Sequence, residues 1–213
     1  MAKYALGCLG VLVTVFVIAV ILGLFAIGTY NGLVTSSQAV NTQWAQVQTV
    51  YQRRADLIPN LVSTVAGAAN FEKSTLVAVT DARASVGQVK IDPNQAPSDP
   101  EQLAKYQAAQ ASVSSALSRL LVVSENYPNL KSNENFLGLQ AQLEGTENRI
   151  SVERQKFNSV VQTYNTQVKR FPTVLYAGMM GFSPKPFFEA DAGAEKAPKV
   201  NFDFNNATPA PVH

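Results

Sequence analysis

Apolar residues recur every three or four positions along most of the chain, which is the spacing of amphipathic helices. Four such stretches follow one another, and turn-forming segments separate them. The first ends near Gly67, while Asp99–Pro100 and Ser132–Asn133 are typical helix starts, and the last stretch stops at Phe171–Pro172. The pattern therefore predicts an all-α protein.

Helix length favours four helices over three. A single helix from Tyr30 to Lys90 would be about 90 Å long, and its apolar stripe would lack partners over much of that length. A break near Gly67 gives an ascending and a short descending helix, and the last helix then matches the first in length. We therefore expect an antiparallel up-down four-helix bundle over residues 30–188 and a disordered tail over residues 189–213.

A charge-free stretch, ALGCLGVLVTVFVIAVILGLFAIGT, runs from Ala5 to Thr29. As a helix it would cross about 30 Å of hydrocarbon, and it is longer than the apolar region of about 7–15 residues in a cleaved signal peptide. We expect residues 1–29 to be a retained anchor with one transmembrane helix over 5–29, and the lone Cys8 to be an apolar residue within it. Lys3 precedes the span and the next charge is Arg53, so the positive-inside rule favours a body outside the cytoplasm.

The segment YQRRADLIPNL (residues 51–61) places charges among positions that otherwise belong to the core. We count residues along each helix from the distal end of the bundle, the end farthest from the predicted anchor. The charges of this segment then lie at the same height as charges on the second and the last helix. We predict a polar layer across the bundle, made of Arg53, Arg54, Arg83, Glu144, Glu147 and Asn148. A buried ion pair adds little stability over apolar packing, but it penalises a slip of register. An anion-binding site at the arginines and a solvated charged face remain alternatives.

Pro59 lies inside the first bundle helix. It removes one backbone hydrogen bond and clashes with the carbonyl of Ala55, and Asp56 can bond locally to the freed backbone groups. We expect a kink rather than an end, because the apolar spacing resumes in phase.

Tyr-Asn pairs occur at Tyr30–Asn31 and at Tyr164–Asn165, and the predicted bundle brings both to its membrane-proximal end. The segment from Tyr30 to Gln52 has no charge. Tyrosine favours the membrane boundary, and Ala19-x-x-x-Gly23 permits close helix approach. These features predict a membrane-proximal contact surface for homo-oligomers, made of Tyr30, Asn31, Gln38, Thr42, Asn158, Tyr164 and Asn165. Packing at a helix junction, and an exported helix that merely lacks charges, are the alternatives.

Several motifs in order identify a family. The chain resembles the LemA family in YNGLV (30–34), QRRADLIPNLV (52–62), DARA (81–84), YPNLKSNENF (127–136) and LQAQLEGTENRISVERQKFNSVVQTYN (139–165). The resemblance implies a bacterial inner-membrane protein with one N-terminal membrane helix, a helical bundle and no established enzymatic activity. A magnetosome-associated relative suggests a role in membrane organisation.

The sequence lacks the residues that most catalytic and cofactor-binding sites need. His213 is the only histidine, which argues against Ser-His-Asp sites, Cys-His sites and metal sites with histidine ligands. We therefore expect that the protein is not an enzyme and binds no cofactor. The net charge of +2 and the scattered basic residues give no support to nucleic-acid binding. Two functions remain. One is a membrane-anchored, self-associating scaffold with the lipid bilayer as partner. The other is a tethered binding module for a small ligand or a partner membrane protein.

Overall fold

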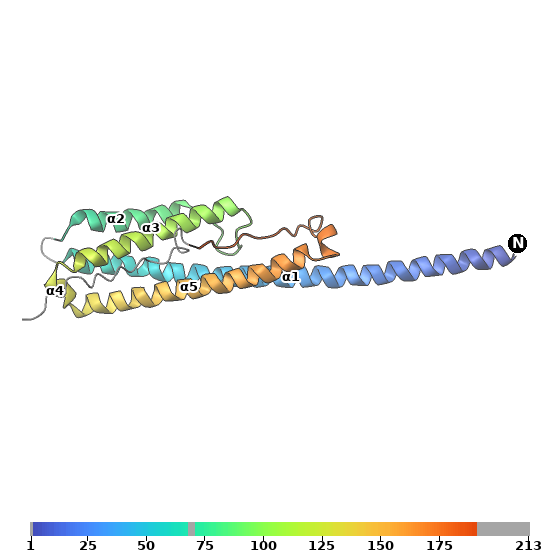
Figure 1. Ribbon diagram of the computed structural model, residues 1–213, viewed down its shortest axis with the longest axis horizontal. Coiled ribbons are helices and arrows are strands. Elements are labelled where there is room, and N and C mark those ends of the chain that lie inside the picture. Colours follow the sequence, from blue (N-terminus) through green and yellow to red (C-terminus); the bar gives the residue numbers. More distant parts are fainter. Residues whose placement is uncertain (1, 68–70, 191–213) are drawn as a thin grey trace, which may run out of the picture.

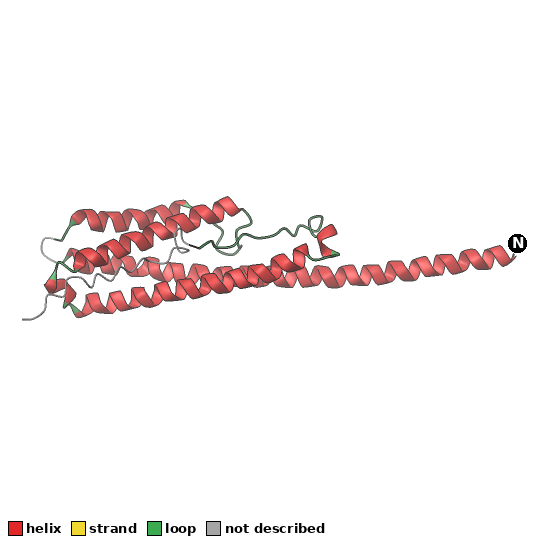
Figure 2. Cartoon of the chain, in the orientation of Figure 1, coloured by secondary structure: helices red, strands yellow, loops and turns green. Residues whose placement is uncertain are grey.

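The structure is a computed structural model that describes residues 2–67 and 71–190. This part of the chain is helical and has no strand (Figures 1 and 2). Its helices are α1 (Ala2–Ala66), α2 (Lys73–Gln88), α3 (Pro100–Ser124), α4 (Pro128–Lys131) and α5 (Glu134–Lys169), followed by the short 3-10 helix η1 (Thr173–Leu175). The predicted all-α class is confirmed.

α1 is one continuous helix of 65 residues that runs through the charge-free stretch and on into the bundle. At 1.5 Å per residue it is about 98 Å long. Its N-terminal part projects beyond the bundle and exposes large apolar side chains, while its C-terminal part packs antiparallel to α5 (Figure 1). Within the described residues, α1 is the one helix apolar and long enough to cross a membrane.

The starts of α3 and α5 follow the predicted local chemistry. The Asp99 carboxylate accepts the N–H of Glu101 at 2.9 Å at the start of α3. The Asn133 side chain accepts the N–H groups of Asn135 and Phe136 at 2.9 and 3.2 Å at the start of α5. The short α4 was not predicted, and it fills the turn between α3 and α5.

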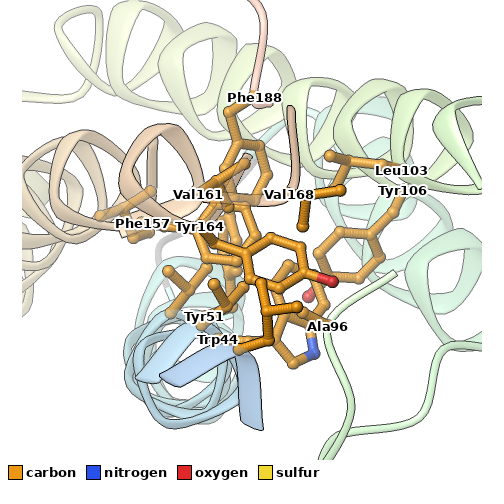
Figure 3. Close-up of a cluster of buried hydrophobic side chains, with 14 of the residues drawn as sticks. Trp44, Tyr51, Ala96, Leu103, Tyr106, Phe157, Val161, Tyr164, Val168 and Phe188 are labelled. Carbon is orange, nitrogen blue, oxygen red and sulfur yellow. The ribbon is translucent and has the colours of Figure 1, made fainter. Parts of the chain in front are cut away.

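α2 and α3 pack against each other along the distal part of the α1–α5 pair and stop short of its membrane-proximal end (Figure 1). The bundle core therefore has two clusters. The distal cluster is mostly aliphatic, with Leu61 and Leu120 among its members, and it also contains Phe136. The membrane-proximal cluster is aromatic, with Trp44 at its centre (Figure 3). The ring of Trp44 lies 5.6 to 6.0 Å from the rings of Tyr106, Phe157 and Phe188.

Residues 183–189, here called the strap, are extended and run back along the bundle after α5 and η1 (Figure 1). Phe188 of the strap is buried in the aromatic cluster. The predicted tail begins at Glu189, but the backbone of Glu189 is hydrogen-bonded to Gln107 of α3, so this boundary was too early. The predicted tail residues 191–213 lie outside the described residues.

Candidate functional site

Arg54 is the centre of a buried polar cluster between three helices. Its side chain is 2% exposed. Nη1 donates to Glu147 Oε1 of α5 at 2.8 Å and to Ser114 Oγ of α3 at 2.7 Å. Nη2 donates to the backbone carbonyl of Gln110 at 3.2 Å and to the side-chain oxygen of the same residue. The guanidinium charge thus has a carboxylate partner, and it links α1 to both α3 and α5.

Three other residues of the predicted polar layer do not join this cluster. Arg53, Glu144 and Asn148 are exposed. Neighbouring helix positions point about 100° apart, so when Arg54 lies on the buried stripe with Tyr51, Arg53 must face solvent. Gln110 was missed by the sequence analysis. It carried a usable signal, because it is a polar residue at a core position of α3.

Arg83 of α2 reaches α1 by a different contact. Its Nε donates to the backbone carbonyl of Ala55 at 3.1 Å. This carbonyl lacks its usual helical donor because Pro59, four residues later, has no N–H. Asp56 was expected to bond the backbone groups that Pro59 leaves free. Instead its carboxylate accepts a hydrogen bond from Gln52 Nε2 at 2.7 Å. α1 continues through Pro59 as expected, and the predicted kink stays a prediction.

Two open cavities flank Arg54. The first has a volume of about 400 Å³ and lies between α1, α2 and α3, with Gln48, Arg54, Arg83 and Tyr106 in its lining. The second has a volume of about 310 Å³ and lies between α3 and α5, where Glu147 is part of its lining. Both volumes fall within the range of about 300–1,000 Å³ found for small-molecule sites.

The first cavity has one unpartnered polar atom in its lining. Gln48 accepts the hydroxyl of Tyr106 at 3.1 Å, but its Nε2 has no hydrogen-bond partner among the described residues. Arg83 is exposed there and carries a positive charge. Nη1 and Nη2 of Arg54 are already bonded, which leaves Gln48 and Arg83 as polar groups of the lining that could bind a ligand.

Two asparagines of α5 bind the strap through paired amide contacts. Asn165 donates to the carbonyl of Lys185 and accepts its N–H, both at 2.8 Å. Asn158 makes the same pair with Phe188, both at 2.9 Å. The two asparagines are seven residues apart and therefore share one face of the helix. Their side chains thus satisfy backbone groups that a neighbouring strand would satisfy in a sheet.

The predicted membrane-proximal contact surface is therefore divided. Asn158, Tyr164 and Asn165 are engaged within the chain, and the hydroxyl of Tyr164 donates to the carbonyl of Ser183 at 3.0 Å. These three residues were wrongly placed on an outer surface, because the returning strap was not foreseen.

The α1 members of that predicted surface remain on the outside. Tyr30, Asn31, Gln38 and Thr42 are exposed. Tyr30 also touches the edge of the Phe182 ring, with the ring centroids 5.7 Å apart.

Lys185 is buried where the strap crosses the α2–α3 loop. Its Nζ donates to the carbonyl of Ala96 at 3.2 Å. Burial lowers the pKa of its ammonium group below the ordinary value for lysine. Sequence reasoning missed this residue, since a single lysine between two prolines carries no pattern.

The described residues hold no group of three His, Cys, Asp or Glu side chains placed to bind a metal ion. His213 lies outside the described part of the chain. The expectation that the protein is not an enzyme stays a prediction.

Comparisons with known proteins agree with the motifs. The model of the LemA family matches residues 43–202. Magnetosome protein MamQ 1 of Paramagnetospirillum magneticum is 28% identical over 177 residues, which are 75% of this chain and 64% of the relative. Magnetosome protein MamQ of Magnetospirillum gryphiswaldense is 29% identical over 182 residues, 77% of this chain and 66% of the relative. Protein LemA of Metamycoplasma hominis is 21% identical over 164 residues, 77% of this chain and 70% of the relative. The chain spans less than two thirds of the length of the MamQ proteins it matches.

Proposed function

The chain belongs to the LemA family, and we propose that it is a membrane-anchored scaffold that organises the bilayer around it by lateral self-association. The charge-free part of α1 supports the anchor, because it is long and apolar enough to span a membrane. The MamQ relatives are magnetosome proteins by name, which supports a role in a membrane assembly. We further propose that the anchor is retained in a bacterial inner membrane and that the bundle lies on the extracytoplasmic side.

One surface carries the proposal. Between Tyr30 and Gln52, α1 has no charged residue, and most of its exposed side chains form one stripe with three- and four-residue spacing. This uncharged stripe consists of Asn31, Thr35, Gln38, Thr42, Gln46 and Thr49. A solvated helix face normally carries charges. An uncharged face can instead pack against a second copy without the high cost of burying an ion.

The threonines of the uncharged stripe make it less polar than its composition implies. The hydroxyls of Thr35 and Thr49 donate to the carbonyls of Asn31 and Ala45, each at 2.9 Å. Their hydrogen bonds are made within α1, so a second helix does not have to supply partners for them.

The anchor offers a separate contact in the bilayer. Ala19 and Gly23 are exposed one turn apart, and the space beside Gly23 is open. Small residues at this spacing let two membrane helices approach closely. At 100° per residue, Ala19 and Gly23 lie about 120° round the continuous helix α1 from the uncharged stripe, so this would be a second, separate contact between copies.

Cysteine crosslinking in native membranes tests the scaffold. With Cys8 replaced by serine, we expect Gln38→Cys and Thr42→Cys to link two chains when an oxidant is added at native expression. The control is Gln162→Cys, an exposed position on α5 that lies near the height of Gln38 and is predicted not to crosslink. Equal crosslinking at all three positions would indicate random collision, and no crosslinking at Gln38 and Thr42 would remove the support for a scaffold.

A second candidate function is a tethered binding module for a small anionic ligand or a partner membrane protein. The cavity beside Arg83, with the unpartnered Nε2 of Gln48, favours it. A ligand that binds the folded state raises its stability by mass action. We would therefore measure thermal unfolding with phosphate and with dicarboxylates, in the wild type and in Arg83→Gln. Stabilisation that Arg83→Gln loses and that Arg53→Gln keeps would support this function, because Arg53 does not line the cavity. No stabilisation of the wild type would count against it.

A further inference from the structure

A compact apolar turn follows α5. No charged residue lies between Arg170 and Lys185. Within this segment Phe171 is 77%, Leu175 67% and Met179 83% exposed, and Val174 is also exposed. Elsewhere in the described bundle, exposed large apolar residues such as Val122 are scattered singly, as is normal for soluble surfaces. Here several of them gather within one turn.

This turn is a built element with a defined outer face. The N–H of Ala177 donates to the carbonyl of Thr173 at 2.8 Å, and the N–H of Phe182 donates to the carbonyl of Ala177 at 2.9 Å. Thr173 and Ala177 are buried. Gly181 has a φ of +83°, which favours glycine over residues with a side chain. The backbone thus holds the large apolar side chains outward.

The turn lies at the height where α1 leaves its apolar stretch. Phe25 and Thr29 of α1 line a cavity of about 330 Å³ together with Arg170, Phe171 and Pro172. The contact between Tyr30 and Phe182 fixes the other end of the turn at the same height. If residues 5–29 span the bilayer, the exposed side chains of the turn therefore lie at the depth of the last turn of the anchor.

We propose that residues 171–182 form a second membrane contact, with Phe171, Val174, Leu175 and Met179 seated in the interface of the bilayer that α1 crosses. The lipid accounts for an apolar surface that the other described residues leave uncovered. Lys169 and Arg170 come directly before the turn and are exposed, which suits contact with anionic head groups. Two points of attachment set the rotation of the bundle about the membrane normal, and hence the direction in which the uncharged stripe faces.

The inference rests on the proposed anchor, so the experiment probes both. The full chain with Cys8→Ser carries one cysteine at Phe16, Leu175 or Val122, labelled with an environment-sensitive fluorophore. It is reconstituted in vesicles of phosphatidylcholine and phosphatidylglycerol that contain lipids spin-labelled either high or low on the acyl chain. Val122 is the matched control, since it is an exposed apolar residue of α3 near the distal end of the bundle.

We expect the shallow spin label to quench the probe at Leu175 several-fold more than the probe at Val122, and the deep label to quench the probe at Phe16. Quenching at Phe16 with equal, weak quenching at Leu175 and Val122 would overturn the second membrane contact and leave the anchor intact. No quenching at Phe16 would overturn the anchor and the inference together. A probe at Met179 guards against local damage by the label, because Met179 is more exposed than Leu175 and must give the same result.

Discussion

Replacing Glu147 by glutamine tests the buried polar cluster with a minimal change of shape. The variant removes the negative charge that faces the guanidinium of Arg54 at 2.8 Å. Arg54 keeps its bonds to Gln110 and Ser114, and the new amide oxygen can still accept one hydrogen bond. The perturbation is therefore the loss of a counter-charge to a buried cation.

The size of the effect follows from the exposure of the two partners. Breaking a fully buried ion pair costs about 3–5 kcal/mol, whereas exposed pairs contribute about 0–1 kcal/mol. Arg54 is 2% exposed but the side chain of Glu147 is 39% exposed, so water screens part of the interaction. We expect Glu147→Gln to lower the free energy of unfolding by about 1–2 kcal/mol, which for a chain of this size corresponds to a fall in Tm of about 2–8 °C.

The assay is denaturant unfolding of the full chain in one detergent, followed by far-UV circular dichroism. Glu144→Gln is the control, because Glu144 is an exposed carboxylate one turn earlier on α5 and its replacement should change stability by less than about 0.5 kcal/mol. The cost of Glu147→Gln should also shrink when Arg54 is already methionine, since the two residues act on each other. An equal cost in both backgrounds, or equal costs for the two glutamate variants, would refute this account of the cluster.

Three further predictions use the same measurement. Asn165→Ala should cost about 2–4 kcal/mol, since the buried N–H and C=O groups of Lys185 lose their partners. Asn165→Asp should cost at least as much, because its buried carboxylate accepts the N–H but puts a charged oxygen against the Lys185 carbonyl. Arg83→Met should lower the free energy of unfolding by up to about 1 kcal/mol in the wild type. The cost should be smaller in a Pro59→Ala background, because the N–H of the alanine can bond the Ala55 carbonyl that Arg83 binds in the wild type. A cost that does not depend on residue 59 would contradict this. Burial raises the pKa of the Tyr51 phenol to about 12, so the folded state keeps a proton that the unfolded state loses, and stability should fall as pH rises above about 10. Tyr51→Phe should show a smaller fall over that range, and an unchanged pH dependence would contradict the assignment.

Features that depend on neighbouring residues were predictable. The caps at Asp99 and Asn133 are local, because a side chain bonds backbone groups two or three residues away. The helical stripes and the charge-free anchor stretch follow from periodicity and composition alone. The common height of Arg54 and Glu147 also followed from counting residues along antiparallel helices, because the rise per residue is constant.

Counting along helices did not decide which side chains meet. The choice of Arg54 over Arg53 depends on how α1 is rotated against α3 and α5, and that rotation is set by packing of the whole core. The partner of the carbonyl left free by Pro59 was sought locally at Asp56, but the second helix supplies it through Arg83. In both cases the contact joins segments that only the tertiary fold brings together.

The strap shows the same division most clearly. By itself the sequence determined the long helices, the starts of α3 and α5 and the anchor stretch, since each of these rests on local spacing and local hydrogen bonds. Residues 183–189 have no period and form no hydrogen-bonded element of their own, so their backbone groups must find partners elsewhere. Asn158 and Asn165 supply those partners from 20 to 30 residues away, and Gln107 supplies them from 82 residues away. Only the tertiary structure placed these amides beside the strap, because the sequence does not show which backbone groups a side-chain amide will bind.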